Sequence, residues 1–150
     1  MYKNSIVHHI TKLLVDVLFY CGILCVVAVP VWAGRLLKYY GYTDNGIIAF
    51  SAILFVSGIC AVYILFVLKQ MFKTLLGGNP FVEQNINSFR KMAVACALIA
   101  AIYIFKCFIM FTWATVIIAL VFVIGTLFCL TLKDLFKQAV YYKEENDWTV

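Results

Sequence analysis

Two charged residues, Asp16 and Lys106, lie inside long runs of apolar residues. A charge at the centre of a bilayer costs on the order of 2.5–3.5 kcal/mol, so such residues are commonly paired or functional. Asp16 lies about one helical turn inside the first run, and two interpretations are open. It is either an interfacial residue paired with a nearby basic residue such as Lys12, or a functional carboxylate within the membrane.

Lys106 belongs to the third apolar run, roughly 21 Å along a helix from Met92. At that height its aliphatic stem can carry the ammonium group to the nearer membrane surface. Asp16 lies toward the opposite surface, so a buried pair between the two is not expected. Asp44 is the better placed candidate partner for Lys106.

The remaining reactive residue types form no recognisable catalytic or metal-binding motif. The sequence has no HExxH, no Ser/His/Asp set, no paired carboxylates in the runs and no phosphate-binding loop. The six cysteines all lie within apolar runs and none has CxxC spacing, so we expect them to behave as small apolar residues. The sequence predicts a protein that is not an enzyme and binds no metal or cofactor. The cysteines are Cys21, Cys25, Cys60, Cys96, Cys107 and Cys129.

The longest polar interruption between the apolar runs is the connector at residues 69–91. Two glycines at its centre precede Asn79 and Pro80, and these two can cap a helix and occupy its first position. From Phe81 onward, apolar residues return at roughly helical spacing with polar residues between them. This pattern predicts a short amphipathic helix at a membrane surface that leads into the third run.

Composition indicates the elements that hold these residues in place. The chain is 65% hydrophobic and 13% charged, whereas soluble domains are roughly 45–50% apolar and about 25% charged. Each run is near the roughly 20 residues that cross a bilayer. We therefore predict an all-α integral membrane protein, a single domain over 1–150 with two antiparallel hairpins. The predicted spans are 13–33, 47–68, 92–111 and 115–132.

The distribution of Lys and Arg predicts the orientation of these spans. If the N-terminus is inside, nine basic residues near the span ends face the cytoplasm and three face outward. Both termini are then cytoplasmic, in the plasma membrane. The net charge of +5 reflects this topology and attraction to anionic lipid, and does not require nucleic acid. Outside, we expect Pro30 to kink or end the first span and residues 34–46 to form the connection.

The C-terminal segment, 133–150, is predicted to be a cytoplasmic helix and tail. Leu135, Phe136 and Val140 belong to an apolar stripe at helical spacing, and an acidic patch follows. Two interpretations are open for that patch. It is either a solvated helix end, or a docking surface that binds a cytoplasmic partner or the connector, where Arg90 and Lys91 complement its charge.

Two motifs resemble those of a bacterial family of small four-span membrane proteins of unknown function. They are Gly78-Asn79-Pro80-Phe81 with Asn85 and Arg90, and Leu135-Phe136-(x2)-Ala139 followed by Glu145-Asn146-Asp147-(x)-Thr149-Val150. Members of that family are commonly encoded beside a small Cro/CI-type helix-turn-helix regulator, so the resemblance implies a membrane partner of such a regulator. Trp148 departs from the smaller aliphatic residue common there. The family has no known catalytic residues to transfer.

The preferred hypothesis is a non-catalytic membrane protein that binds or modulates a cytoplasmic helix-turn-helix regulator. The alternative is an immunity or stress-resistance protein that meets a membrane-active peptide or hydrophobic compound, and a homo-oligomeric pore is a third hypothesis. The candidate partner-binding residues are Asn79, Pro80, Phe81, Asn85, Arg90, Phe136, Glu145, Asn146 and Asp147.

Overall fold

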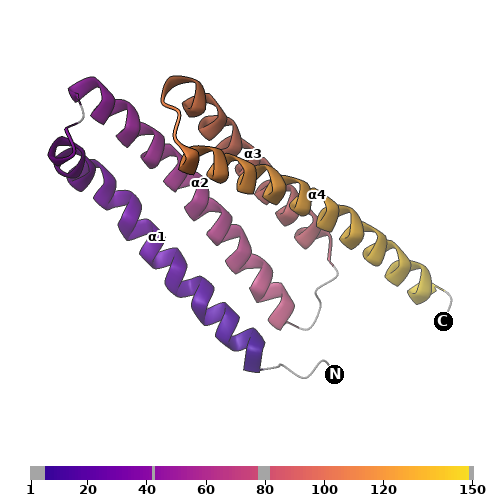
Figure 1. The fold of residues 1–150 in the computed structure, drawn as a ribbon. Helices are drawn as coiled ribbons and strands as arrows, with labels where there is room; N and C mark the ends of the chain where they lie inside the picture. Colours follow the sequence, from indigo (N-terminus) through magenta and orange to yellow (C-terminus); the bar gives the residue numbers. More distant parts are fainter. Residues whose placement is uncertain (1–5, 42, 78–81, 149–150) are drawn as a thin grey trace.

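Four long helices make up the protein. The computed structural model describes residues 6–41, 43–77 and 82–148. All four helices are long and apolar enough to cross a membrane, which confirms the predicted fold class. The helices are α1 (Ile6–Tyr39), α2 (Asp44–Leu76), α3 (Glu83–Ile109) and α4 (Trp113–Trp148) (Figure 1).

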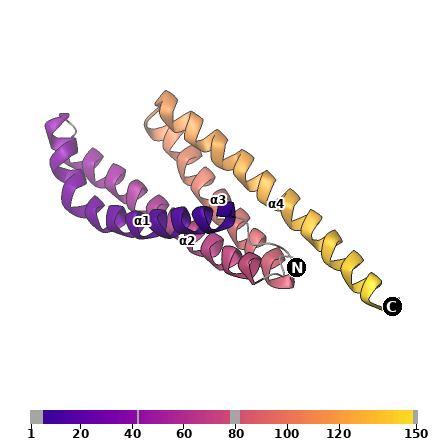
Figure 2. The same ribbon diagram turned by 90° about the horizontal axis from the view of Figure 1, so that it is seen from below.

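The helices form two antiparallel hairpins, α1–α2 and α3–α4, joined by a contact between α2 and α3. Within the described ranges, the backbone of α1 does not approach that of α3 or α4. Figure 2 shows α1 and α4 diverging at opposite sides of the molecule. The start of α1, the end of α2, the start of α3 and the end of α4 lie toward one end (Figure 1), called the inner end below.

Glycines bring α1 and α2 close together. A Cβ atom built at Gly58 would lie 2.8 Å from Cγ2 of Val26, and one at Gly22 would lie 3.2 Å from Cγ2 of Val62. In a membrane the hydrophobic effect does not drive helices together, so they associate through close van der Waals packing. Small residues such as glycine permit this packing. Gly58 is therefore a packing position in the α1–α2 hairpin.

The second hairpin contributes most of the buried core, and α3 is the most enclosed helix. Ile99 and Tyr103 of α3 pack with Ala119 of α4. Cys60 and Ile64 of α2 also pack against this cluster, so the core joins α2 to the second hairpin. The inner-end side chains of α3 are held on this framework.

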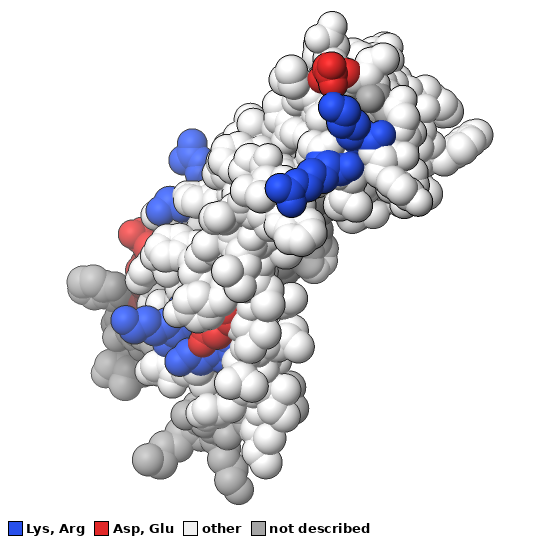
Figure 3. All heavy atoms as spheres, turned by 90° about the vertical axis from the view of Figure 1, so that its left-hand side faces the viewer, with Lys and Arg blue, Asp and Glu red and all other residues white. Residues whose placement is uncertain are grey.

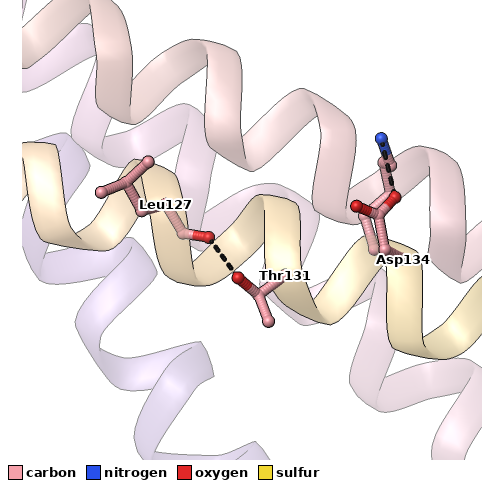
Figure 4. A network of polar contacts seen from close by, with 4 residues as sticks. Leu127, Thr131 and Asp134 are labelled. Atoms are coloured by element: carbon pink, nitrogen blue, oxygen red, sulfur yellow. Dashed lines mark hydrogen bonds and ion pairs between the residues drawn. The ribbon is translucent and has the colours of Figure 1, made fainter.

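Hydroxyl groups within the apolar segments bond back to their own helices. Ser57 donates to the carbonyl oxygen of Ile53 at 2.8 Å, and Thr126 donates to that of Phe122 at 2.8 Å. Figure 4 shows the same arrangement for Thr131, which donates to the carbonyl oxygen of Leu127 at 2.9 Å. No water is present in a bilayer core, so these local bonds satisfy the hydroxyls without a partner helix.

The surface is dominated by exposed apolar side chains. Phe108 is 85% exposed and Leu24 69% exposed, and similar residues occur on all four helices. In Figure 3 most of the visible face is uncharged, and the charged side chains form separate groups. Lipid covers such a surface in a membrane, whereas a water-soluble protein rarely exposes apolar patches of this extent. The bilayer is therefore the environment of these helices.

The outer connection is shorter than predicted. We expected Pro30 to kink or end the first span and residues 34–46 to be a connection. Instead α1 includes Pro30 and continues to Tyr39, and α2 begins at Asp44. Gly41, with φ of 78°, supplies the left-handed conformation that this turn requires. Leu36, Leu37 and Tyr39 belong to the extension of α1, so the predicted length of this connection is wrong.

The amphipathic segments are continuous with the spans. α3 begins at Glu83 and its N-cap, Val82, is extended, so the helix start predicted at Pro80 is wrong. Asn79, Pro80 and Phe81 lie outside the described residues. At the other end of the second hairpin, α4 continues without interruption to Trp148. The predicted cytoplasmic C-terminal helix is therefore the last part of α4.

Candidate functional site

A hydrogen bond joins α2 to α3 at the inner end. The hydroxyl of Thr74, near the end of α2, lies 2.9 Å from Oδ1 of Asn85 in the first turn of α3. The same hydroxyl lies 2.7 Å from the carbonyl oxygen of Met71. Asn85 is only 3% exposed, and a buried amide requires such partners. Asn85, predicted as a partner-binding residue, is therefore part of the framework that positions the inner surface.

A ring contact joins α3 to α4 at the same end. The centroids of Phe89 and Phe136 are 4.9 Å apart, with an interplanar angle of 59°. Phe89 is buried and Phe136 is half-buried. Pairs at this separation add a specific attraction to the burial of apolar area. Phe136, also predicted to bind a partner, packs the α4 extension against the start of α3.

The last turns of α4 carry exposed acidic and aromatic side chains. Glu144, Glu145 and Asn146 are exposed, and so are Tyr141 and Tyr142. In both Figure 1 and Figure 2 this part of α4 projects past the ends of the other helices. The side chain of Asp147 lies outside the described part of the structure. The predicted acidic patch is thus carried on a helix that projects from the inner end.

Among the described residues, Arg90 and Lys91 form no ion pair with the acidic patch. Arg90 and Lys91, with Asn87, line a groove between α2 and α3. The ion pairs among the described residues are Asp16 with Lys69 and Lys133 with Asp134. The predicted clamp between the α4 acids and Arg90 or Lys91 is therefore not formed in the part of the chain that the structure describes.

Asp16 pairs with a lysine from the neighbouring helix. Its Oδ1 lies 3.0 Å from the ammonium nitrogen of Lys69 on α2, so the predicted pairing with Lys12 is wrong. The ammonium group also lies 5.3 Å from the ring centroid of Phe19 and 5.1 Å from that of Tyr20. The pair joins α1 to α2 at the inner boundary, which supports the interfacial interpretation of Asp16.

Lys106 contacts aromatic rings instead of Asp44. It is 8% exposed, and its ammonium nitrogen lies 4.4 Å from the ring centroid of Phe50 and 5.7 Å from that of Tyr103. Attraction between a cation and aromatic rings partly offsets the cost of burying the charge. The predicted ion pair with Asp44 does not form, because Phe50 of α2 covers the ammonium group.

No metal-binding constellation occurs among the described residues: no three His, Cys, Asp or Glu side chains gather as ligands. All six cysteines are free thiols.

Sequence reasoning missed several partners at the inner end. Lys69, Thr74 and Phe89 were not candidate site residues, yet each fixes a contact between two helices. A usable signal existed for Lys69, because it immediately follows the second run and Asp16 lies just inside the first. Antiparallel neighbours bring those two boundaries to the same membrane surface.

The helices and their lipid-exposed apolar surface define a multi-pass helical membrane protein. Residues 46–150 match the family described as "Protein of unknown function (DUF2975)", and the chain belongs to that family. The match covers α2 to α4 and both motifs on which the resemblance was based, while α1 precedes it. No match is found among curated proteins or solved structures.

Proposed function

We propose that this protein is a non-catalytic protein of the plasma membrane whose inner end binds a cytoplasmic protein. A small helix-turn-helix regulator is the partner that suits it best. The observation that carries the proposal is the projecting end of α4, which presents exposed Glu144 and Glu145. The Phe89–Phe136 contact anchors the base of this projection.

Charge complementarity supports a DNA-binding partner. Such proteins present a basic surface to DNA phosphates, and an acidic helix face can bind that same surface. Capture at the membrane would then compete with DNA. The family resemblance points the same way, because related proteins are commonly encoded beside Cro/CI-type regulators.

The lengths of the connections favour the inner end as the binding surface. On the outer side the helices are joined by residues 40–43 and 110–112, which leaves little chain for a macromolecular partner. The excess of basic residues at the inner end supports a cytoplasmic location for that end, with both termini inside. An immunity function against an external peptide has no comparable support from these short connections.

The test is capture of the helix-turn-helix regulator encoded beside the gene for this chain by membranes that contain the full protein. Glu145→Lys should weaken capture by about tenfold, roughly 1.4 kcal/mol, because like charges then face each other. Added salt should weaken capture by the unchanged protein. Capture is measured by co-sedimentation with the membranes.

The matched control is Asp44→Lys, which reverses one carboxylate at the outer start of α2. This variant should capture the regulator as well as the unchanged protein. Equal capture by Glu145→Lys and the unchanged protein would contradict the proposal. If no gene for a helix-turn-helix regulator lies beside the gene for this chain, the family resemblance no longer supports the proposal.

A further inference from the structure

The groove between α2 and α3 has a basic inner end and apolar walls, and the proposed function does not use it. It has a volume of about 630 Å³, within the roughly 300–1,000 Å³ typical of small-molecule sites. It lies between two helices that pack where the two hairpins meet (Figure 1). An apolar groove of this size on a membrane protein faces lipid.

One stripe of α3 forms a wall that changes from polar to apolar. Asn87, Lys91, Val94 and Leu98 line the groove at spacings of four, three and four residues, which places them on one helical face. Val94 and Leu98 are 55% and 53% exposed. Leu98 lies roughly 10 Å along the axis from Lys91. The polar end is the one nearer the start of α3, at the inner end.

The facing wall on α2 is apolar, and the charge of the groove is uncompensated. Ile59 and Tyr63 line this wall and are 49% and 41% exposed. No acidic residue from the described part of the chain lines the groove. Among the described residues, neither Arg90 nor Lys91 forms an ion pair. The groove therefore combines two basic side chains with an apolar channel of limited length.

We propose that this groove binds an anionic phospholipid. The phosphate group lies between Arg90 and Lys91, where the amide of Asn87 can donate to it, and an acyl chain lies along Val94 and Leu98. Basic pockets between membrane helices recognise acidic headgroups in this way. The apolar walls favour a lipid over a free phosphate ion, because only a lipid has an acyl chain that can contact them.

Other basic residues at the inner end provide a matched comparison. Lys133 forms an ion pair with Asp134 at 3.1 Å (Figure 4), and Lys137 lines the same shallow hollow of α4 as Asp134. These lysines carry the same charge at the same end of the molecule but do not line the α2–α3 groove. If anionic lipid bound only through general attraction to positive charge, Arg90 and Lys91 would contribute no more to binding than Lys133 and Lys137.

The experiment measures lipid binding to the full chain in detergent by native mass spectrometry, with phosphatidylglycerol and phosphatidylcholine as probes. The unchanged protein should prefer phosphatidylglycerol. The R90Q/K91Q variant should lose this preference by about 30-fold, since each basic residue near an anionic headgroup contributes about fivefold. The K133Q/K137Q control should retain it.

A second variant tests the acyl channel. Val94→Trp fills the groove from an exposed position and should weaken binding of phosphatidylglycerol while Arg90 and Lys91 are retained. It also tests the site if the R90Q/K91Q variant fails to fold. Millimolar inorganic phosphate should not displace the lipid, and displacement would assign the site to free phosphate and overturn the proposal. Equal loss in both double variants, or unchanged binding in Val94→Trp, would overturn it as well.

Discussion

The rings of Phe89 and Phe136 lie 4.9 Å apart at the inner end and join the start of α3 to the α4 extension. Phe89 is 47 positions before Phe136 in the chain, and both lie where their helices leave the apolar core. This contact determines the direction in which α4 projects. The proposed binding surface depends on it, because the acidic residues lie two to three turns further along the same helix.

Removal of one ring should destabilise this junction. Phe89→Ala should lower the free energy of unfolding by about 3 kcal/mol, because it removes a buried aromatic side chain. In a double-mutant cycle with Phe136→Ala, the coupling energy should be about 1 kcal/mol. Unfolding in a titration of denaturing detergent measures both quantities. Phe128→Ala is the control, because Phe128 is 62% exposed; an equal cost there would contradict the role of the ring pair.

The ion pair between α1 and α2 should contribute measurably to the first hairpin. Asp16→Ala leaves the Lys69 ammonium without its carboxylate and should lower the thermal unfolding midpoint, by a modest amount because both side chains are partly exposed. The exchanged variant D16K/K69D should recover part of that loss, since it restores opposite charges. Thermal unfolding in mild detergent measures the shift. Asp134→Ala, which removes an exposed carboxylate from a pair within α4, should have almost no effect. A D16K/K69D variant no more stable than Asp16→Ala would contradict the prediction.

The close approach of α1 to α2 should make Gly58 sensitive to a single added methyl group. Gly58→Ala places a Cβ 2.8 Å from Cγ2 of Val26 and should cost about 1–3 kcal/mol through overpacking. Combining it with Val26→Ala should relieve part of the cost. Gly34→Ala is the control, because nothing lies within 4 Å of its added Cβ. Equal unfolding midpoints for the two alanine variants would contradict this packing.

Burial under Phe50 should protect Lys106 from modification. A water-soluble amine-reactive ester should label Lys106 about tenfold more slowly than Lys38, since the ammonium group is buried against aromatic rings. Lys38 is exposed at the end of α1 and provides an internal reference. Phe50→Ala should increase the labelling of Lys106 and leave that of Lys38 unchanged. Mass spectrometry of peptides measures the rates, and fast labelling of Lys106 in the unchanged protein would contradict its position.

The proposed orientation predicts on which side of the membrane the C-terminus and the α1–α2 connection lie. A reporter that is active only in the cytoplasm should be active when it is fused after Val150. The same reporter fused after Gly41, in the outer connection, should be inactive, because residues 40–43 face the other side. The opposite pattern would place the acidic end of α4 outside the cell and exclude an intracellular partner.

The sequence by itself determined the class of the protein and the number of spans. Four apolar runs near the length needed to cross a bilayer leave few alternatives to four membrane-spanning helices. The reason is that a helix satisfies all the backbone hydrogen bonds of a segment within lipid. Two glycine- and proline-containing boundaries were less predictable: α1 continues past Pro30 and α3 begins only at Glu83.

Only the tertiary structure decided which residues meet. Helices that are apolar on every side carry little information about which face contacts which neighbour. The sequence therefore could not select Phe50 for Lys106 or Thr74 for Asn85. Those contacts depend on the rotation and lateral order of the helices, which side-chain packing sets. The groove beside Arg90 and Lys91 has the same origin, since it exists only because α2 lies against α3.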